Sequence, residues 1–218
     1  MAPISGPEVP FPNRRAGGAA LAALLTTRRD LGPDPVVVAL PRGGVPVGVE
    51  VADALGAPLD VIIVRKLGTP AQPELAMGAI GEGGARILNH EVLDALRITA
   101  EQLDAVERRE RVELERRAQR LRAGRARVPL TGHTAILVDD GLATGSTARA
   151  AILVAREQGA GRVVVATPVA PRLTVAELAD VADAVVCAAT PEPFRAIGQW
   201  YVDFRPTSDD EVVALLQR

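Results

Sequence analysis

The chain has 218 residues, of which 48% are hydrophobic and 24% are charged, a balance typical of a globular domain with a buried core. Its formal net charge of -2 gives no overall basic field, which argues against a nucleic-acid partner. No apolar run approaches the roughly 18 residues of a membrane helix, so we expect no membrane span.

The chain carries a single cysteine, Cys187, and cannot form an internal disulfide, which suits a reducing cytoplasm. Residues 1–10 contain several prolines and no apolar core of a signal peptide, so we predict a loose leader there. Length and composition favour a single domain over residues 1–218, and we expect it to be cytoplasmic.

Helical patterns and short apolar runs alternate at the start of the chain. They predict a helix, a buried strand, a helix and a second buried strand, over residues 14–29, 36–40, 45–56 and 59–66. The second strand ends in two basic side chains, Arg65 and Lys66.

A loop rich in glycine follows these elements. Residues 67–84 hold five glycines and two prolines, which favours mobile, irregular structure. We expect one weak strand inside it, AMGAI, and a hairpin arm over residues 85–89. Residues 67–90 are therefore predicted to form a mobile lid.

Residues 99–123 predict a long, charged helix that starts at a capping box formed by Thr99 and Gln102. Arginine and glutamate balance along it, so we expect a solvated helix rather than a nucleic-acid site. Dimer packing is the one further role that this added helix suggests. Its single apolar stripe consists of Leu103, Val106, Leu114 and Leu121.

After Gly132 the alternation becomes regular. Strands are predicted over residues 134–140, 162–169 and 184–190, and helices over residues 146–159, 174–180 and 208–218. Strands that are apolar throughout and alternate with helices indicate an α/β fold, in which helices cover both faces of a parallel twisted sheet.

The segment AILVDDGLATGST, from Ala135 to Thr147, is the most informative for chemistry. Its apolar strand ends in Asp139 and Asp140, which suit the vicinal hydroxyls of a sugar or the waters of a Mg²⁺ ion. The helix N-terminus that follows offers N–H groups and hydroxyls to a phosphate, from Ala143, Thr144, Gly145, Ser146 and Thr147. Phosphate at one end and a diol at the other describe a ribose 5-phosphate. A plain strand-to-helix turn with an N-cap is the alternative.

This segment resembles the signature of type I phosphoribosyltransferases: a hydrophobic strand, two acids and a phosphate loop rich in Thr, Ser and Gly. The resemblance implies that the chain binds 5-phosphoribosyl 1-diphosphate with Mg²⁺. It also implies the fold of that family, and a homodimer is the family expectation. In topology the resemblance covers roughly residues 36–190, and the helix over residues 99–123 is an addition to the minimal fold.

Two further matches lie at the expected places. The turn after the first strand, with Arg42, Gly43 and Gly44, resembles the loop by which the family holds pyrophosphate, and the resemblance implies a cis peptide at Pro41–Arg42. Arg65 and Lys66 resemble the basic pair that grips the diphosphate. Taken alone, the first match is an ordinary Gly-Gly turn, and the second is an exposed basic pair.

The reaction implied is displacement at C1 of the ribose by a nitrogen nucleophile, with pyrophosphate as the leaving group. Arg42 and the basic pair would stabilise the charge that develops on pyrophosphate. Asp139 and Asp140 would hold the ribose hydroxyls and, through water, the Mg²⁺ ion. Glu74 on the lid is the further polar group assigned to catalysis.

The acceptor is less well defined. Enzymes of this family that act on hypoxanthine and guanine carry an acid where this chain has Ala143, which argues against a 6-oxopurine. The loop is closer to that of adenine phosphoribosyltransferases. Residues 191–218 are interpreted as a hood in which Trp200, Tyr201 and Phe204 stack on a base. Equally open is that these aromatics fasten the C-terminal segment or form a dimer seam.

Two other functions fit the same residues. One is a sensor domain that binds phosphoribosyl diphosphate without turnover and regulates a partner. The other is a hydrolase of sugar phosphates or nucleotides, which would need a positioned water and a base near Asp139 and Asp140.

Overall fold

Short runs of β-branched and other apolar residues form a central sheet of five strands in the order β2-β1-β6-β7-β8. The computed structural model describes residues 9–218, so most of the predicted leader over residues 1–10 lies outside the described residues. All neighbouring strands in this sheet are parallel, which confirms the predicted architecture. The strands are β1 (Val36–Ala39), β2 (Leu59–Val61), β6 (Thr134–Val138), β7 (Arg162–Val169) and β8 (Ala184–Ala189).

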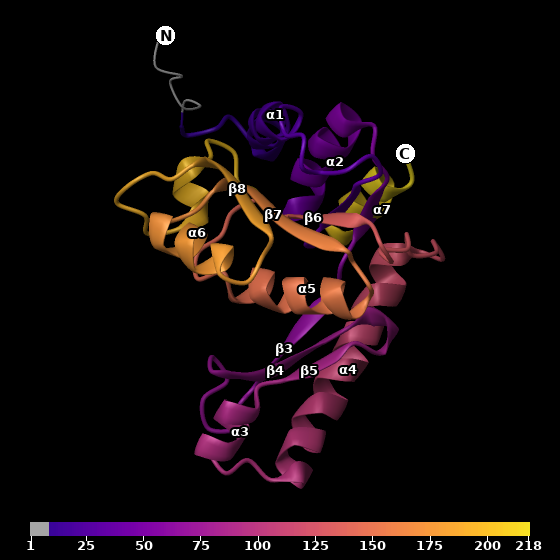
Figure 1. Cartoon of the computed structure of the whole chain (residues 1–218), viewed down its shortest axis with the longest axis vertical. Coiled ribbons are helices and arrows are strands. Elements are labelled where there is room, and N and C mark those ends of the chain that lie inside the picture. Colours follow the sequence, from indigo (N-terminus) through magenta and orange to yellow (C-terminus); the bar gives the residue numbers. More distant parts are fainter. Residues whose placement is uncertain (1–8) are drawn as a thin grey trace.

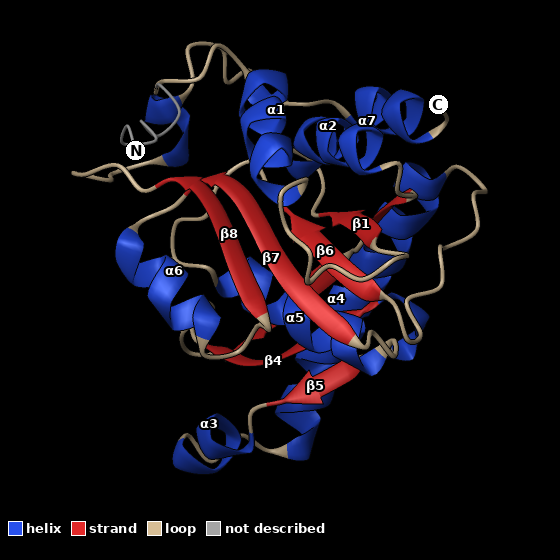
Figure 2. Cartoon of the chain, turned by 45° about the horizontal axis from the view of Figure 1, so that its top comes forward, coloured by secondary structure: helices blue, strands red, loops and turns tan. Residues whose placement is uncertain are grey.

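Helices cover both faces of this sheet, as predicted (Figure 2). One face is covered by α1 (Arg14–Leu25) and α2 (Gly44–Leu55), and the other by α5 (Ser146–Glu157) and α6 (Arg172–Ala179). Because side chains alternate along a strand, Ile136 of β6 packs with α1 and α2, whereas Leu137 packs with α5.

Helix α1 ends at Leu25, earlier than the predicted end at residue 29. Two threonines account for the difference. The hydroxyl of Thr26 donates to the carbonyl of Ala23, and that of Thr27 donates to Leu24. These side chains satisfy the last carbonyls of the helix and compete with its continuation.

The predicted single strand over residues 59–66 is wrong. It divides after β2, and β3 (Val64–Gly68) leaves the central sheet to pair antiparallel with β4 (Ala76–Gly81). The two residues at the division face different cores, since Ile62 packs under the central sheet and Ile63 packs in the second sheet. A continuous apolar run looks the same whether it serves one core or two.

The second sheet has the order β3-β4-β5, with β5 spanning Arg86–Leu88. This confirms the weak strand and the hairpin arm predicted within residues 67–90, and a 3-10 turn (Glu82–Gly84) joins β4 to β5. Together with α3 (His90–Ala95) and α4 (Ala100–Arg122), the sheet forms an arm that extends away from the central sheet (Figure 1). The irregular loop is thus limited to residues 69–75, and its movement as a lid stays a prediction.

Helix α4 begins as predicted, because Thr99 and Gln102 form a reciprocal capping box. The predicted apolar stripe is also confirmed, since all four of its side chains are buried in the core of the arm. At the C-terminus, α7 (Asp209–Leu216) packs against α2 and α4 and is capped by Ser208. None of the helices in residues 9–218 combines the length and apolar character that crossing a membrane requires.

The C-terminal end of α4 is fastened to the central sheet through Arg122. Its guanidinium lies 2.9 Å from Oδ1 of Asp60 and donates to Oε2 of Glu82 at 2.9 Å. The three side chains are 11%, 5% and 9% exposed, respectively. A buried cation between two buried carboxylates makes this junction sensitive to the loss of any partner.

We expect Arg122→Met to lower the free energy of unfolding by about 3–5 kcal/mol, because Asp60 and Glu82 would remain buried without a cation. Urea denaturation measures this change. The matched control is Arg116→Met on the same helix, whose side chain is 65% exposed and pairs with Glu113. The control should cost less than about 1 kcal/mol. Similar small losses in both variants would contradict the assigned role of Arg122.

Candidate functional site

Two neighbouring strands bring the predicted motifs together. β1 pairs in parallel with β6, with Ala39 opposite Val138, so both strands end at the same edge of the sheet. The turn with Arg42, Gly43 and Gly44 follows β1, and Asp139 and Asp140 follow β6. Ligands of open parallel sheets bind beyond this carboxyl edge.

The backbone of the turn packs closely against the segment that carries the acids. A Cβ atom added to Gly43 would lie 2.0 Å from Oδ2 of Asp140, and one added to Gly44 would lie 2.5 Å from the carbonyl oxygen of Val138. Both positions therefore require glycine for close packing against the acids. The Pro41–Arg42 peptide is cis, as the resemblance implied.

Asp140 is held from several sides and is 8% exposed. Nε of Arg14 lies 2.7 Å from its Oδ2 atom, and the hydroxyl of Tyr201 donates to its backbone carbonyl. Arg14, at the start of α1, is a site residue that sequence reasoning missed. No local pattern marks it, because its partner lies 126 residues away in the chain.

Asp139 is half-buried and has no ion pair among the described residues. Its Oδ1 atom accepts a hydrogen bond from the backbone N–H of Asp140 at 2.9 Å. Burial of its charge and the negative charge of Asp140 raise the pKa of Asp139 well above its ordinary value. A carboxylate in such a place gains from a cation or from hydroxyl donors.

The predicted phosphate loop forms the N-terminus of α5. Gly145 has a φ of 70°, a left-handed conformation that favours glycine, and it directs the chain into the helix. The hydroxyl of Thr174 donates to the carbonyl of Ala143 at 2.6 Å and fixes the loop from below. Ser146 and Thr147 stay exposed at the start of the helix. The Ser146 hydroxyl accepts a hydrogen bond from that of Thr144 at 3.2 Å and can still donate to a ligand.

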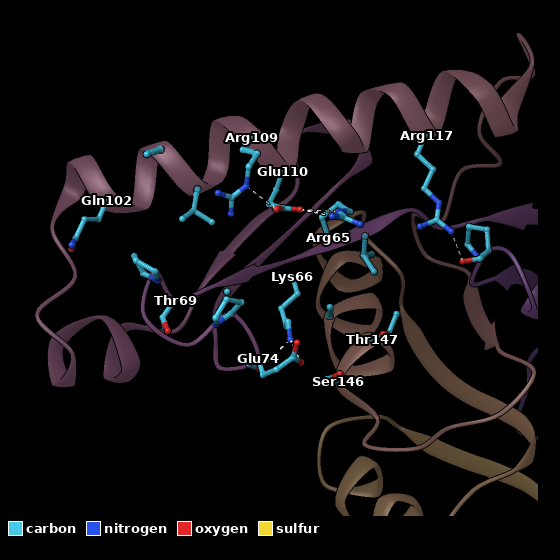
Figure 3. A pocket seen from close by; sticks show the side chains of 18 residues that line it. Arg65, Lys66, Thr69, Glu74, Gln102, Arg109, Glu110, Arg117, Ser146 and Thr147 are labelled. Carbon is cyan, nitrogen blue, oxygen red and sulfur yellow. Dashed lines mark hydrogen bonds and ion pairs between the residues drawn. The ribbon is translucent and has the colours of Figure 1, made fainter. Parts of the chain in front are cut away.

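A cavity of about 870 Å³ lies between the arm and the start of α5. Side chains of β3 and α4 line one wall, and Ser146 and Thr147 at the start of α5 line the other (Figure 3). Pro41 also lines it, so the turn that touches Asp140 reaches the cavity. The predicted phosphate loop and the predicted basic pair thus face one space.

Both members of the basic pair have carboxylate partners. Arg65 forms an ion pair with Glu110 of α4 at 2.6 Å, and Lys66 forms one with Glu74 at 3.0 Å. The Glu74 side chain is 99% exposed, so its contact with Lys66 is open to exchange. Sequence reasoning did not identify Glu110, which lies on the helix that was expected to be solvated.

The predicted hood aromatics form a cluster beside Asp140. Tyr201 is 5% exposed and packs against Phe11 and Phe204, and the guanidinium of Arg14 lies 3.9 Å above the Phe204 ring. These contacts favour fastening of the C-terminal segment as the role of Tyr201. Trp200 is partly exposed, and its indole N–H has no hydrogen-bond partner within residues 9–218. Contact with an acceptor stays a prediction for all three aromatics.

We expect Asp139→Asn to stabilise the fold at neutral pH. Because its pKa is raised, Asp139 holds its proton more tightly in the folded state than in the unfolded state. The free energy of unfolding therefore falls as the pH rises from 3.8, the ordinary pKa, toward the higher pKa of the folded state. Denaturation at several pH values should show no gain for Asp139→Asn near pH 3 and a growing gain above pH 4.

The control is Asp203→Asn, because a hydrogen bond from Arg205 lowers the pKa of that exposed carboxylate. This control should give no gain at any pH. A gain shared by both variants would indicate a general effect of surface charge and would contradict the assignment to Asp139.

The sequence profile of the phosphoribosyl transferase domain family matches residues 13–191 of this chain. Two Mycobacterium tuberculosis proteins, from strains CDC 1551 and H37Rv, are provisionally named phosphoribosyl transferases and are 56% identical to it over 208 residues. Those residues make up 95% of this chain and 46% of each relative. The chain therefore spans about half the length of the curated relatives it matches.

The crystal structure of TT1426 from Thermus thermophilus has the same fold, with a TM-score of 0.86 and 43% sequence identity. The alignment covers 94% of this chain and 97% of that chain, so the likeness extends over nearly all of both. With a family match over most of its length and relatives at this level of identity, the chain belongs to the phosphoribosyl transferase domain family.

Proposed function

We propose that this chain transfers the 5-phosphoribosyl group from phosphoribosyl diphosphate to a nitrogen acceptor, with a nucleobase as the expected class. The bond between C1 of the ribose and the diphosphate oxygen breaks, and the oxygen keeps the electron pair. The lone pair of the acceptor nitrogen forms the new bond to C1 from the opposite side, and that nitrogen then loses a proton. Pyrophosphate is released.

One observation carries the proposal: the close packing of the turn at Gly43 and Gly44 against the two acids, beside a helix N-terminus rich in hydroxyls. A ligand bound at this edge would meet backbone N–H groups, carboxylates and hydroxyls in turn. Phosphoribosyl diphosphate carries a diphosphate, a diol and a 5-phosphate, which these groups match in chemistry.

Each group has a role in this scheme. The 5-phosphate would bind the loop from Ala143 to Thr147, where the helix dipole and N–H groups favour an anion. Asp139 and Asp140 would hold the ribose hydroxyls and the positive charge that develops at C1. Since Arg14 already occupies Oδ2 of Asp140, we assign the larger share of this contact to Asp139 and leave Oδ1 of Asp140 to complete it.

Mg²⁺ fits this site as an ion that arrives with the ligand. No group of three or more metal-binding side chains gathers among the residues that the structure describes. The ion would be held through water by Asp139 and Asp140 and by oxygens of the ligand, as Mg²⁺ commonly is beside phosphates. When bound, it neutralises negative charge on the diphosphate.

The leaving diphosphate would be stabilised by Arg42 and by the pair Arg65 and Lys66. The ion pair between Lys66 and Glu74 would have to open for this, which would free Glu74 on the loop over residues 69–75. We assign to that loop the exclusion of water, because a cationic centre at C1 would otherwise be hydrolysed.

Calorimetric titration of the protein with phosphoribosyl diphosphate, with and without Mg²⁺, tests the proposal. We expect binding that depends on Mg²⁺ and is lost in the variant with Asp139→Asn and Asp140→Asn. The single variant Asp139→Asn is the control for folding, because it should bind weakly although its fold is more stable at neutral pH. Unchanged affinity in both variants would refute the site.

Release of pyrophosphate then separates the three functions. Release that requires an added base identifies a transferase, and release without any acceptor identifies a hydrolase. Binding without release, over a panel of purine and pyrimidine bases, identifies a sensor. Because Ala143 replaces an acid, we expect adenine to be a better acceptor than hypoxanthine or guanine.

We expect Trp200→Ala to raise the KM for the acceptor about fivefold or more without changing the KM for phosphoribosyl diphosphate. Loss of one stacking surface costs about 1–3 kcal/mol. The control is Phe194→Ala, because Phe194 packs against Trp200 with a distance of 6.0 Å between ring centroids. If both variants lower the Tm and leave the KM for the acceptor unchanged, Trp200 has a structural role and the hood interpretation fails.

A further inference from the structure

Arg117 of α4 stands out among the basic side chains around the cavity. Its side chain descends from the helix toward the cavity (Figure 3), and its guanidinium donates to the carbonyl of Pro41 at 3.0 Å. Pro41 begins the turn that contacts Asp140, so α4 touches the proposed diphosphate loop directly. The guanidinium is partly buried there.

The other basic residues of the cavity are neutralised by acids. Arg65 and Arg109 both contact Glu110, at 2.6 and 3.4 Å, and Lys66 pairs with Glu74. Within residues 9–218, Arg117 is the one basic residue lining this cavity that has no carboxylate partner.

The surroundings of Arg117 are unfavourable for a cation without an anion. Burial and the nearby charges of Arg42 and Arg65 lower the pKa of its guanidinium. The two acids whose charges favour this guanidinium are engaged elsewhere: Glu113 pairs with Arg116 at 2.7 Å, and Asp209 lies 3.7 Å from Arg42. A bound anion would relieve this concentration of positive charge.

We propose that Arg117 binds the diphosphate group of the ligand together with the turn from Pro41 to Gly44. The bond to Pro41 fixes the guanidinium and leaves further N–H donors for phosphate oxygens, which arginine binds well. The inference rests on the proposed function, and it gives the arm a part in ligand binding. It also assigns the diphosphate a cation that is available without breaking an ion pair.

The test compares wild-type protein with Arg117→Gln and Arg117→Lys by calorimetry, with Mg²⁺ and pyrophosphate as the probe. Gln keeps a donor for the Pro41 carbonyl and removes the charge, so we expect it to weaken pyrophosphate binding about tenfold or more. Lys keeps the charge and should retain most of the affinity. Both variants should bind ribose 5-phosphate like the wild type, because that ligand lacks the diphosphate.

Arg108→Gln is the matched control, since Arg108 is exposed on the same helix and does not line the cavity. Pyrophosphate binding of Arg117→Gln equal to that of the wild type would overturn the inference. Parallel loss of pyrophosphate and ribose 5-phosphate would also overturn it, because it would show that the turn itself is disturbed.

The same titrations separate this inference from the proposed function. If the wild type and Arg117→Gln bind phosphoribosyl diphosphate with equal affinity, the inference is rejected and the proposed function stands. Pyrophosphate binding that depends on Arg117, in a protein that does not turn over phosphoribosyl diphosphate, supports the inference and rejects the transferase. Binding of neither ligand by the wild type rejects both.

Discussion

The close contact between the turn after β1 and the acids after β6 is the constraint on which the rest of the site depends. A Cβ atom at Gly43 would lie 2.0 Å from the Asp140 carboxylate, so the two segments can meet only where one of them lacks a side chain. Parallel pairing of β1 with β6 brings both segments to one edge, and Arg14 and Tyr201 then hold Asp140 from the other side. The C-terminal aromatics consequently serve the geometry of the acids, whatever else they contact.

The arm shares an apolar core with α2 and α7, and charged contacts along α4 also join it to this site. At one end of α4, Arg122 lies between the buried carboxylates of Asp60 and Glu82. Further along the helix, Glu110 holds Arg65, and Arg117 reaches the carbonyl of Pro41. Three successive parts of one helix therefore set the position of the cavity wall. The buried end is costly to break, whereas the partly exposed end near the cavity is able to exchange partners.

Much of the fold and the central part of the site could be predicted from the sequence, because both are encoded locally. The segment from Asp139 to Thr147 contains two acids after a strand and the N-terminus of the next helix in one stretch. The capping box of α4 lies within four residues, and the apolar stripe of this helix repeats at helical spacing. The division between β2 and β3 could not be predicted, since Ile62 and Ile63 are equally apolar although they face different cores. Arg14 and Arg117 were missed for another reason: each contacts its partner across long separations in sequence.

The charges around the cavity imply an order of events on binding. Lys66 is occupied by Glu74, so a diphosphate would have to displace that carboxylate to reach it. Glu110 holds Arg65 through Nε and Nη2 and leaves Nη1 for a phosphate oxygen. Arg117 needs no such exchange and would form the first contact. Glu74, which is almost fully exposed, is the partner most easily displaced, whereas Glu110 is 13% exposed and is held on α4. Binding would thus release Glu74 while Arg65 keeps its partner, which couples occupancy of the diphosphate site to movement of the loop over residues 69–75.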